Sequence, residues 1–380
     1  IYNRFMEELY IGLMSGTSVD SVDSVLVNLA NQRVQVLAKI STTIPKDLKI
    51  QTLKATNSEN LSTQTIESLD NQFGILFAKA ASNLLDINSI NKSNIKAIGS
   101  HGQTIKHSPY PPRPYSLQVG SPEKIVQLTG IKTVADFRSA DIEASGEGAP
   151  LTPLFHQFVF KCNNLDKGIV INIGGICNLT FINNKKNELF GYDCGPGNCL
   201  LDTWARFHGK GDYDTAGKWA SSGNIIPELL KIMASDPFFS LNHPKSTGPD
   251  YFNLAWLKKK VDLLNQIPSG KDVQATLSEL TAQIIFQELK KLESLKDKVY
   301  VCGGGIHNNF LAQNIQKKIR GKALSTESLG VDPDYLEAIC FAWLAQQRLK
   351  NVEFNLAKIT GSKKLLCLGK VWDVSDRTSK

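Results

Sequence analysis

The chain places two aspartates inside a turn of small residues near its start. Residues 12–27 read GLMSGTSVDSVDSVLV, where two apolar runs flank a turn of glycine, serine and threonine that carries Asp20 and Asp23. A plain β-hairpin turn needs glycine or asparagine at two positions, and it needs neither hydroxyl side chains nor carboxylates. The turn is therefore a candidate functional site. The structural alternative is that each aspartate only caps a backbone N–H of the turn.

Three glycine-bearing turns share the same setting. Each directly follows an apolar stretch, and they lie at 16–18 (GTS), 174–175 (GG) and 303–305 (GGG). Backbone N–H groups in such turns can converge on an anion, and glycine lets a phosphate approach the main chain. One such turn is weak evidence, whereas three in one chain favour phosphate binding. Tight hairpins and helix caps are the alternative, above all for the third turn, which precedes a predicted helix.

The better-known nucleotide motifs are absent. The sequence has no G-x-x-x-x-G-K-[ST] loop, no G-x-G-x-x-G followed by a suitably spaced acidic residue, and no protein-kinase set. Two of the glycine turns open the two halves of the chain, which suggests two α/β lobes with a cleft between them. A phosphate turn from each lobe is typical of the sugar-kinase, heat-shock-protein and actin architecture.

Hydrophobic periodicity and β-branched runs predict the elements that position these turns. In the first half we predict helices after Pro45 and over 62–86 and 122–128, with strands over 9–14, 22–29, 34–42, 95–102 and 132–138. In the second half we predict helices over 198–207, 309–318 and 334–349, with strands over 168–175, 177–183, 188–194, 298–305 and 323–326. Both halves open with strand, glycine turn, strand, strand. The predicted fold class is α/β, a two-lobed duplicated actin-like ATPase fold with mixed sheets flanked by helices and an active-site cleft between the lobes.

Composition narrows the class of protein. The 380 residues are 42% hydrophobic and 21% charged, which is ordinary for a globular chain with two lobes. The net charge of +7 is mild and the lysines are dispersed, so no nucleic-acid partner is expected. No apolar run approaches the roughly 18 residues of a membrane span, and the seven cysteines lack a C-x-x-C motif, which suits free thiols in a reducing cytoplasm. The chain opens with Ile1, so its true start is expected upstream or at Met6.

The chain resembles the anhydro-N-acetylmuramic acid kinase family. The resemblance rests on nine stretches that run in the family's order and span nearly the whole chain: GLMSGTSVDSVD (12–23), GSHGQTIKHSP (99–109), QVGSP (118–122), VADFRSADIEASGEGAPLTP (134–153), NIGGICNLT (172–180), YDCGPGNCLLD (192–202), STGPDYFN (246–253), CGGGIHN (302–308) and DPDYLEAICFAWLA (332–345). One departure is visible, because the family usually has glycine where this chain has Ser21.

The resemblance implies a reaction. ATP phosphorylates O6 of 1,6-anhydro-N-acetylmuramic acid while water cleaves the 1,6-anhydro ring, and the products are N-acetylmuramic acid 6-phosphate and ADP, in peptidoglycan recycling. The bridge oxygen is then both the leaving group at C1 and the nucleophile toward the γ-phosphate. The lobes implied are 1–140 together with about 365–380, and 141–364.

The resemblance also implies where ATP and Mg²⁺ bind. The implied ATP-binding positions are Gly16, Thr17, Ser18, Val19, Asp20, Ser21, Val22, Asp23, Gly174, Gly175, Gly303, Gly304 and Gly305. A carboxylate beside triphosphate oxygens requires a cation between them, and Mg²⁺ often takes only one or two protein carboxylates. Asp20 is therefore the predicted metal ligand, and Asp23 is expected to orient the turn.

Two carboxylates match the family's acid–base positions. Asp193, in YDCGPGN, matches the catalytic base that takes the proton of the water, and it stands where a strand ends and a Gly-Pro-Gly turn begins. Glu337, on a predicted helix, matches a second catalytic carboxylate that polarises the same water or binds a sugar hydroxyl. The alternatives are a turn or helix cap for Asp193 and a surface position for Glu337.

Five further residues are candidate sugar ligands. Arg138 suits the anionic lactyl group, because arginine grips carboxylates with two parallel hydrogen bonds. Asp136 is expected to hold that arginine or a sugar hydroxyl, and Asn178 to face the γ-phosphate or the sugar. His101 and Gln103 are expected at sugar hydroxyls or the lactyl carboxylate, with a satisfied interior histidine as the alternative.

Two other classes of protein stay open at this point. An actin-like or heat-shock-like ATP-binding protein would need no Asp193 and Glu337 pair, and a glycosidase would use a carboxylate pair without phosphate turns. The expected partners are ATP and the anhydro-sugar, with no nucleic acid and no membrane, in the cytoplasm. A homodimer is compatible with the sequence, which leaves the oligomeric state open.

Overall fold

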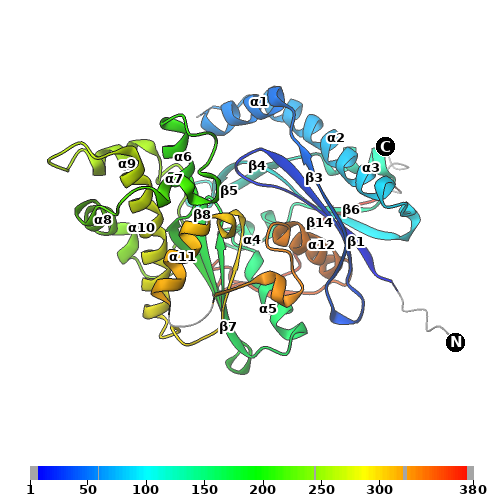
Figure 1. Ribbon diagram of the computed structural model, residues 1–380. Coiled ribbons are helices and arrows are strands. Elements are labelled where there is room, and N and C mark those ends of the chain that lie inside the picture. Colours follow the sequence, from blue (N-terminus) through cyan, green and yellow to red (C-terminus); the bar gives the residue numbers. More distant parts are fainter. Residues whose placement is uncertain (1–6, 59, 244, 320–322, 375–380) are drawn as a thin grey trace. The chain divides into compact units, whose positions relative to one another are not determined.

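The computed structural model describes residues 7–58, 60–243, 245–319 and 323–374 (Figure 1). Met6 and the end of the predicted segment 365–380, from residue 375 on, lie outside the described residues. The chain divides into two compact units. Unit 1 comprises Ile1–Cys162 and Tyr335–Lys380, and unit 2 comprises Asn163–Asp334. Each unit has its own sheet and its own core, and each is described by itself.

Unit 1 is built on a mixed seven-stranded sheet with the order β14-β6-β4-β1-β2-β3, in which β5 pairs with β4. The pairs β1–β2 and β2–β3 are antiparallel, whereas β1–β4 and β4–β6 are parallel. The strand bounds are Leu9–Ser15 (β1), Ser21–Asn28 (β2), Gln35–Thr43 (β3), Ile95–Ser108 (β4), Tyr115–Val119 (β5), Thr133–Ala135 (β6) and Lys370–Trp372 (β14).

Unit 2 repeats this topology. Its five-stranded sheet has the order β11-β10-β7-β8-β9, with antiparallel pairs β7–β8 and β8–β9 and parallel pairs β10–β7 and β10–β11. The bounds are Lys167–Ile173 (β7), Ile176–Asn183 (β8), Glu188–Pro196 (β9), Val299–Cys302 (β10) and Ala323–Ser325 (β11). Three antiparallel strands followed by two parallel ones thus occur in both units, in the same order. The duplicated α/β fold predicted from the sequence is confirmed.

In unit 1, helices cover both faces of the sheet (Figure 1). Phe73 and Phe77 of α2 share a buried core with Ile11 and Leu13 of β1, so α2 covers the face on which those alternate side chains lie. The opposite face carries α12. The helix bounds are Lys46–Asn57 (α1), Thr63–Ile87 (α2), Pro122–Thr129 (α3), Ser139–Glu143 (α4), Thr152–Cys162 (α5) and Leu336–Leu349 (α12).

Two glycines bring α12 against the sheet backbone. A Cβ at Gly12 would collide with the carbonyl oxygen of Ala338, and a Cβ at Gly99 would collide with that of Phe341. No larger residue fits at either position without moving the helix. This close packing places the first turn of α12, which contains Glu337, against the middle of β1.

Unit 2 contains a long buried helix, α10 (Gly270–Lys291), which the sequence analysis did not predict. Val273, Leu277 and Ile284 of α10 contribute to the apolar core of the unit. The other helices are Cys199–Phe207 (α6), Lys218–Ser221 (α7), Pro227–Ala234 (α8), Leu254–Val261 (α9) and Asn309–Lys318 (α11). Within the described part of the chain, no helix has the length and apolar character needed to cross a bilayer.

The compact units divide the chain at different residues from the lobes expected from the resemblance. The units change at 162/163 and 334/335, whereas the expected lobes change at 140/141 and 364/365. The segments concerned contain α5 and α12, and α12 packs against β1, β4 and α5. Packing therefore groups both helices with unit 1, and the lobe boundaries stay a prediction.

Two predicted strands end earlier than expected. β6 covers only Thr133–Ala135 because Asp136 has a positive φ of 49°, which breaks the extended backbone. β10 ends at Cys302, since Gly303 has a φ of 81° and the next residues form a short helical turn, Gly304–His307. In both places the strand stops where a candidate site residue begins.

Candidate active site

The first glycine turn connects β1 to β2 and leaves room for a ligand at its backbone. A Cβ added to Gly16 would meet no atom within 4 Å. Thr17 and Ser18 are exposed, whereas Val19 is only 1% exposed and anchors the turn in the core. Val19 also takes the one positive φ of the turn, 56°, and its N–H donates to the carbonyl of Gly16 at 3.2 Å. The turn is therefore held by a buried valine, and its polar part faces outward.

Ser21 stands where the resemblance leads one to expect glycine, and the structure accommodates it without a positive φ. Ser21 is the first residue of β2, and its backbone carbonyl accepts a hydrogen bond from the hydroxyl of Ser15 at 3.0 Å. Its own hydroxyl lies 3.4 Å from a carboxylate oxygen of Asp23. Because the left-handed residue of the turn is Val19, a glycine is not required at position 21.

Gln103 supports this turn from the neighbouring strand β4. Its Oε1 accepts a hydrogen bond from the Ser15 hydroxyl at 2.7 Å, and its Nε2 lies 3.3 Å from the carbonyl of Gly16 and 3.2 Å from that of Thr104. Gln103 is 1% exposed. The side chain is thus committed to the backbone of the first turn, and its predicted contact with the sugar is untested.

Asp20 has the exposure and the surroundings that a hydrated cation requires. Its carboxylate is exposed and forms an ion pair with Lys49 of α1. A carboxylate that already attracts an ammonium group can attract a divalent cation held by phosphate oxygens. No group of three or more histidine, cysteine, aspartate or glutamate side chains suited to a metal occurs among the described residues. Asp20 therefore fits Mg²⁺ that keeps most of its ligands as water and phosphate, and does not fit a cage made of protein alone.

The second glycine turn follows β7 in unit 2. A Cβ at Gly174 would meet only the carbonyl of Ile176, at 3.4 Å. The carbonyls of Gly174 and Gly175 accept hydrogen bonds from the N–H groups of Asn198 and Cys199, at 2.8 and 3.0 Å, so they cap the start of α6. With both carbonyls bonded, the open side of this turn is accessible to an anion.

In the third turn, the surroundings of the three glycines differ. A Cβ at Gly303 would collide with the side chain of Asn172, and one at Gly305 with the side chain of Ile173, so both glycines let the turn pack on the end of β7. Gly304 has nothing within 4 Å of its added Cβ. Gly16, Gly174 and Gly304 thus leave room for a phosphate or ribose to approach the main chain, whereas close packing explains Gly303 and Gly305.

Asp193 lies on β9 and is held by a segment more than fifty residues away. One carboxylate oxygen, Oδ2, accepts hydrogen bonds from the N–H of Thr247 at 3.0 Å and from the hydroxyl of Ser246 at 3.2 Å. Its backbone N–H donates to the carbonyl of Lys245 at 3.1 Å. Oδ1 has no hydrogen bond from the described residues, so one oxygen is held and the other is available for a proton.

Burial raises the pKa of Asp193 to about 6, although the bonds from Thr247 and Ser246 and the charge of Lys245 act in the opposite direction. A general base works best when its pKa lies near the operating pH. The neighbouring strand β8 places Asn178 directly opposite Asp193, so the two side chains share one region of the sheet.

In unit 1, Arg138 and His101 contact each other directly. Nη2 of Arg138 lies 2.8 Å from Nε2 of His101, whose Nδ1 lies 3.0 Å from the carbonyl of Gly102. The His101 ring also packs on Phe341, with 4.5 Å between ring centroids. Burial, and then the Arg138 charge, hold the pKa of His101 well below its usual range, so the ring is neutral. His101 thus has partners within the protein, as the interior alternative requires, and its predicted contact with the sugar is untested.

Glu337 adds negative charge near Arg138, and Asp23 adds negative charge near Glu337. Burial raises the pKa of Glu337, the Arg138 guanidinium lowers it and the Asp23 carboxylate raises it again. Burial lowers the pKa of Arg138 to about 10, which leaves it charged at neutral pH. The Nε of Arg138 is buried and has no hydrogen-bond partner among the described residues. A buried donor of this kind suits an anionic group of a ligand.

Asp136 does not hold Arg138 in the structure. Its carboxylate accepts hydrogen bonds from the backbone N–H and the hydroxyl of Ser139, and it forms an ion pair with Lys370 at 2.7 Å. Burial raises the pKa of Asp136, but Lys370 and Ser139 outweigh this and hold it below its usual value. Asp136 thus caps the start of α4, where Arg138 lies, and its contact with a sugar hydroxyl stays a prediction.

Comparison with known proteins identifies the family of this chain. The model of the anhydro-N-acetylmuramic acid kinase family matches residues 8–374. The chain belongs to the anhydro-N-acetylmuramic acid kinase family. Curated members from Coxiella burnetii and Sulfurovum sp. are 40% and 42% identical to it over 368 residues, covering 96% of this chain and 98% and 99% of theirs. A member from Shewanella oneidensis is 42% identical over 363 residues, or 95% of this chain and 97% of that one.

Among solved structures, a ROK family glucokinase from Streptomyces griseus aligns with a TM-score of 0.38 at 14% identity, over 89% of this chain and 99% of that one. Component A of the (R)-2-hydroxyglutaryl-CoA dehydratase of Acidaminococcus fermentans aligns with a TM-score of 0.46 at 12% identity, over 88% and 96%. These scores are too low to assign a fold, which in this anhydro-N-acetylmuramic acid kinase family member rests on the repeated strand order.

The residues that hold Asp193 in this family member were not predicted from the sequence. Ser246 and Thr247 begin the stretch STGPDYFN, which was used only for the resemblance. Their hydroxyl and amide donors carry no local signal, because their partner lies 53 and 54 residues away. The two predicted catalytic carboxylates, Asp193 and Glu337, belong to different compact units, and the structure describes the surroundings of each one separately.

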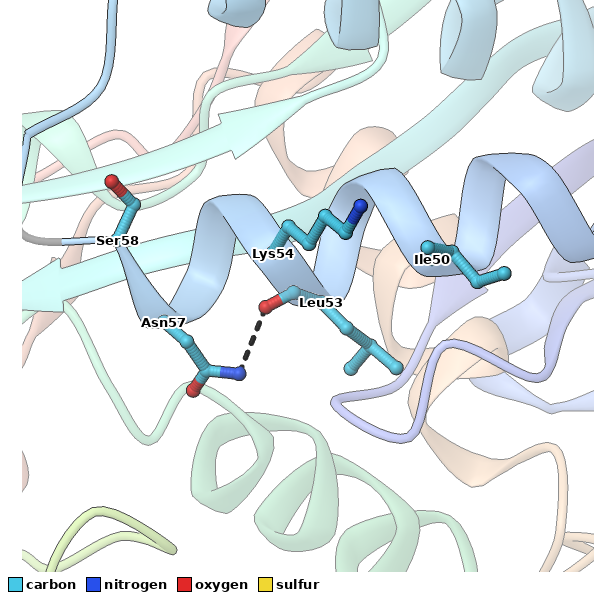
Figure 2. Close-up of a pocket in the computed structure, with 5 residues that line it drawn as sticks. All are labelled: Ile50, Leu53, Lys54, Asn57 and Ser58. Atoms are coloured by element: carbon cyan, nitrogen blue, oxygen red, sulfur yellow. Dashed lines mark hydrogen bonds between the residues drawn. The ribbon is translucent and has the colours of Figure 1, made fainter.

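A hollow on the surface of α1 contains none of the predicted site residues. It has a volume of about 430 Å³ and is lined by Ile50, Leu53, Lys54, Asn57 and Ser58 (Figure 2). The amide of Asn57 donates to the carbonyl of Leu53 at 2.9 Å, so this polar group is already bonded within the helix. The hollow offers no charged cluster for phosphate or sugar.

Proposed function

We propose that this protein is an ATP-dependent kinase that phosphorylates O6 of 1,6-anhydro-N-acetylmuramic acid while water cleaves the 1,6-anhydro ring. The products are N-acetylmuramic acid 6-phosphate and ADP, and the role is in the recycling of peptidoglycan. The observation that carries the proposal is membership of the anhydro-N-acetylmuramic acid kinase family over nearly the whole chain. Relatives at 40–42% identity bear that name.

Asp193 is the proposed base. One oxygen is fixed by Ser246 and Thr247, which leaves the other to take a proton from water as the water attacks C1. The C1–O bond to the bridge breaks, and the bridge oxygen forms a bond to the γ-phosphorus while the bond to ADP breaks. The water oxygen ends as the hydroxyl on C1, and its second proton stays on that hydroxyl. A carboxylate with a pKa of about 6 is ionised at neutral pH, as this step requires.

The three open glycines are the proposed contacts for ATP. Gly16 in unit 1 and Gly174 and Gly304 in unit 2 each leave space at the main chain. The other proposed ATP-binding positions are Thr17 to Asp23 in the first turn, Gly175 in the second turn, and Gly303 and Gly305 in the third. Asp20 is the proposed carboxylate for Mg²⁺, which supplies positive charge to the phosphate oxygens when bound. Asp23 orients the first turn from β2.

Arg138 is the proposed ligand of the lactyl carboxylate, and His101 orients it. The buried Nε of Arg138 supports this role, because an anion would give that N–H a partner. Glu337, whose pKa burial raises, is the proposed second carboxylate at the sugar. Asp136, Asn178 and Gln103 remain candidate sugar contacts. The cytoplasmic location, the homodimer and the lobe boundaries at 140/141 and 364/365 are also proposals.

Isotope labelling tests the reaction directly. The protein is incubated with ATP, Mg²⁺ and 1,6-anhydro-N-acetylmuramic acid in ¹⁸O-labelled water, and the product is analysed by mass spectrometry after a short reaction time. We expect a ring-opened 6-phosphate with one ¹⁸O at C1 and none in the phosphate ester. A phosphorylated product that keeps the anhydro ring, or ring opening without ATP, would contradict the proposal.

The ATP-binding alternative makes a different prediction in the same assay. An actin-like or heat-shock-like ATPase would hydrolyse ATP without the sugar, and the anhydro-sugar would not stimulate it. We expect ADP release to depend on the anhydro-sugar. Because the family match favours the kinase, the alternative is kept only as an outcome of this test.

A further inference from the structure

A buried carboxylate that takes no part in the proposed reaction lies close behind Asp193. Glu288, on α10, has a side chain that is 4% exposed. Its Oε1 accepts hydrogen bonds from the ammonium groups of Lys245 at 3.0 Å and Lys291 at 2.9 Å, and its Oε2 accepts one from the Tyr192 hydroxyl at 3.0 Å. Lys245 is as buried as its partner, with 2% of its side chain exposed.

A buried ion pair of this kind is an unfavourable way to stabilise a core, because both charges lose their hydration. Removing two charges from water costs several kcal/mol for each ion, and apolar residues of similar size often serve as well or better. The charges around Glu288 compensate for part of this cost. Although burial raises the pKa of Glu288, Lys291 and Lys245 outweigh it and hold it below its usual value. Glu288 is therefore ionised, and its buried position calls for an explanation other than stability.

Its position relative to Asp193 supplies that explanation. Two of the three residues that Glu288 holds are next to the site in the sequence: Tyr192 precedes Asp193, the proposed base, and Lys245 precedes Ser246, which donates to that base. Segment 245–247 makes three hydrogen bonds to Asp193, one to its backbone N–H and two to Oδ2. One carboxylate thus ties together strand β9, which carries the base, and the segment that orients it.

We propose that Glu288 is a positioning residue for Asp193: through Lys245 and Tyr192 it fixes the Ser246–Thr247 segment against β9, so that Oδ2 is bonded and Oδ1 is free to take the proton. This role rests on the proposed function for its catalytic meaning. The structural relationship, in which Glu288 controls the surroundings of Asp193, holds independently of the substrate.

The direction in which the pKa of Asp193 changes in Glu288→Gln distinguishes a positioning role of Glu288 from a purely electrostatic one. Glu288→Gln leaves the positive charge of Lys245 near Asp193 without its negative partner, and that charge by itself lowers the pKa of Asp193. If the Ser246–Thr247 segment loosens, Asp193 loses two hydrogen bonds that favour its ionised form, and its pKa rises. Positioning therefore predicts that the acidic limb of the pH profile of kcat moves to higher pH, and charge removal alone predicts the reverse.

The test compares Glu288→Gln with Glu279→Gln on the same helix. Glu279→Gln breaks a different ion pair, to Lys318, which does not involve segment 245–247. We expect Glu288→Gln to lower kcat by about 10- to 100-fold, the size of effect seen when a catalytic group is misplaced by a fraction of an ångström to 1 Å. The acidic limb should move to higher pH and KM for ATP should stay unchanged. Glu279→Gln should alter only the melting temperature.

A double variant keeps the proposal testable if Glu288→Gln does not fold. In the double variant Lys245→Met, Glu288→Met both charges are replaced by apolar side chains, which should keep the fold while removing the anchor. We expect the same loss of kcat at an unchanged melting temperature. A kcat within threefold of wild type in this variant, or an acidic limb that moves to lower pH in Glu288→Gln, would overturn the proposal.

A second readout separates this inference from the proposed function. The carboxyl carbons of aspartate are labelled with ¹³C, the Asp193 signal is assigned with Asp193→Asn, and its titration is followed by NMR in wild type and variants. If wild type does not turn over the anhydro-sugar, the proposed function fails. The NMR titration then still decides the inference, which is supported by an upward shift in Glu288→Gln and overturned by an unchanged or lowered midpoint.

Discussion

Nη2 of Arg138 lies 2.8 Å from Nε2 of His101, although the two residues are 37 positions apart in the sequence. Arginine can only donate and the Gly102 carbonyl can only accept, so this geometry assigns the tautomer: His101 carries its proton on Nδ1 and accepts at Nε2. His101 thus holds a charged guanidinium just after the end of β6. Both ring nitrogens of His101 have partners, whereas Nε of Arg138 has none among the described residues and can donate to a ligand.

Replacement of Arg138 should weaken binding of the muramic sugar. Arg138→Ala is expected to raise KM for the anhydro-sugar by roughly 10- to 150-fold, since a charge-assisted hydrogen bond contributes about 1.5–3 kcal/mol. KM for ATP should not change. Steady-state kinetics would measure both, with Arg113→Ala, an exposed arginine in the loop before β5, as the control. An unchanged KM for the sugar would assign the lactyl carboxylate to other residues.

Replacement of Gln103 should weaken the binding of ATP through the first glycine turn. Gln103→Ala removes the bonds to Ser15 and Gly16, and the first turn should lose its fixed shape. We expect KM for ATP to rise about fivefold, corresponding to one hydrogen bond of about 1 kcal/mol. The matched control is Gln118→Ala on β5, whose amide bonds Thr104 and Ser116. If Gln103→Ala instead raised KM for the sugar alone, Gln103 would be a sugar ligand.

Asp20 and Lys49 should have opposite effects on the requirement for Mg²⁺. Asp20→Asn should raise the Mg²⁺ concentration needed for half-maximal binding of ATP by about tenfold, a change of roughly 1.4 kcal/mol. Lys49→Met should lower it, because the ammonium that competes for the Asp20 carboxylate is gone. Calorimetric titration of ATP at several Mg²⁺ concentrations measures this without turnover. Equal Mg²⁺ dependence in all three proteins would remove Asp20 from the metal site.

Asp193→Asn should bind both substrates and turn over very slowly. Asparagine keeps the shape and still accepts the bonds from Ser246 and Thr247, but it cannot take the proton of water. General base catalysis contributes about 10²–10⁴-fold, so kcat should fall by that factor with KM for ATP unchanged. Asp212→Asn, an exposed aspartate of unit 2, serves as the control. A variant that kept more than about a tenth of wild-type kcat would shift attention to Glu337.

The same substitution should change stability in a pH-dependent way. The pKa of Asp193 is about 6 in the folded protein and near its ordinary value of about 4 in the unfolded chain. The contribution of its protonated form to stability is fully present below about pH 4 and is lost as the pH rises through about 6. Asparagine carries no charge, so Asp193→Asn should melt at a higher temperature than wild type at pH 7–8, and the difference should shrink toward pH 4. Calorimetry across this range would show it, and a difference that stays constant with pH would contradict the burial of the charge.

Local patterns in the sequence were sufficient to predict many of the strands, the glycine turns and the family of this protein. Strands β1, β2 and β7 to β9 begin and end within about two residues of their predicted positions, because alternation and β-branched runs are properties of neighbouring residues. The glycine turns could be recognised for the same reason. The nine stretches of the resemblance sufficed to predict the family, and the strand order common to both units confirms the duplication.

Tertiary structure decided which polar side chains act together. Helix α10 has no simple amphipathic pattern, since Gln274, Ser278 and Glu288 are buried on it beside apolar residues, and periodicity alone could not reveal it. The partners of His101, Gln103 and Asp193 lie 37 to 88 residues away, and only the folded chain brings them within hydrogen-bond distance. The sequence determined which residue types are available for chemistry. Packing determined that His101 and Gln103 hold other groups in place. Among the described residues, it also left Oδ1 of Asp193 without a hydrogen bond. A buried hydrogen bond depends on distance in space and leaves no trace in the local sequence.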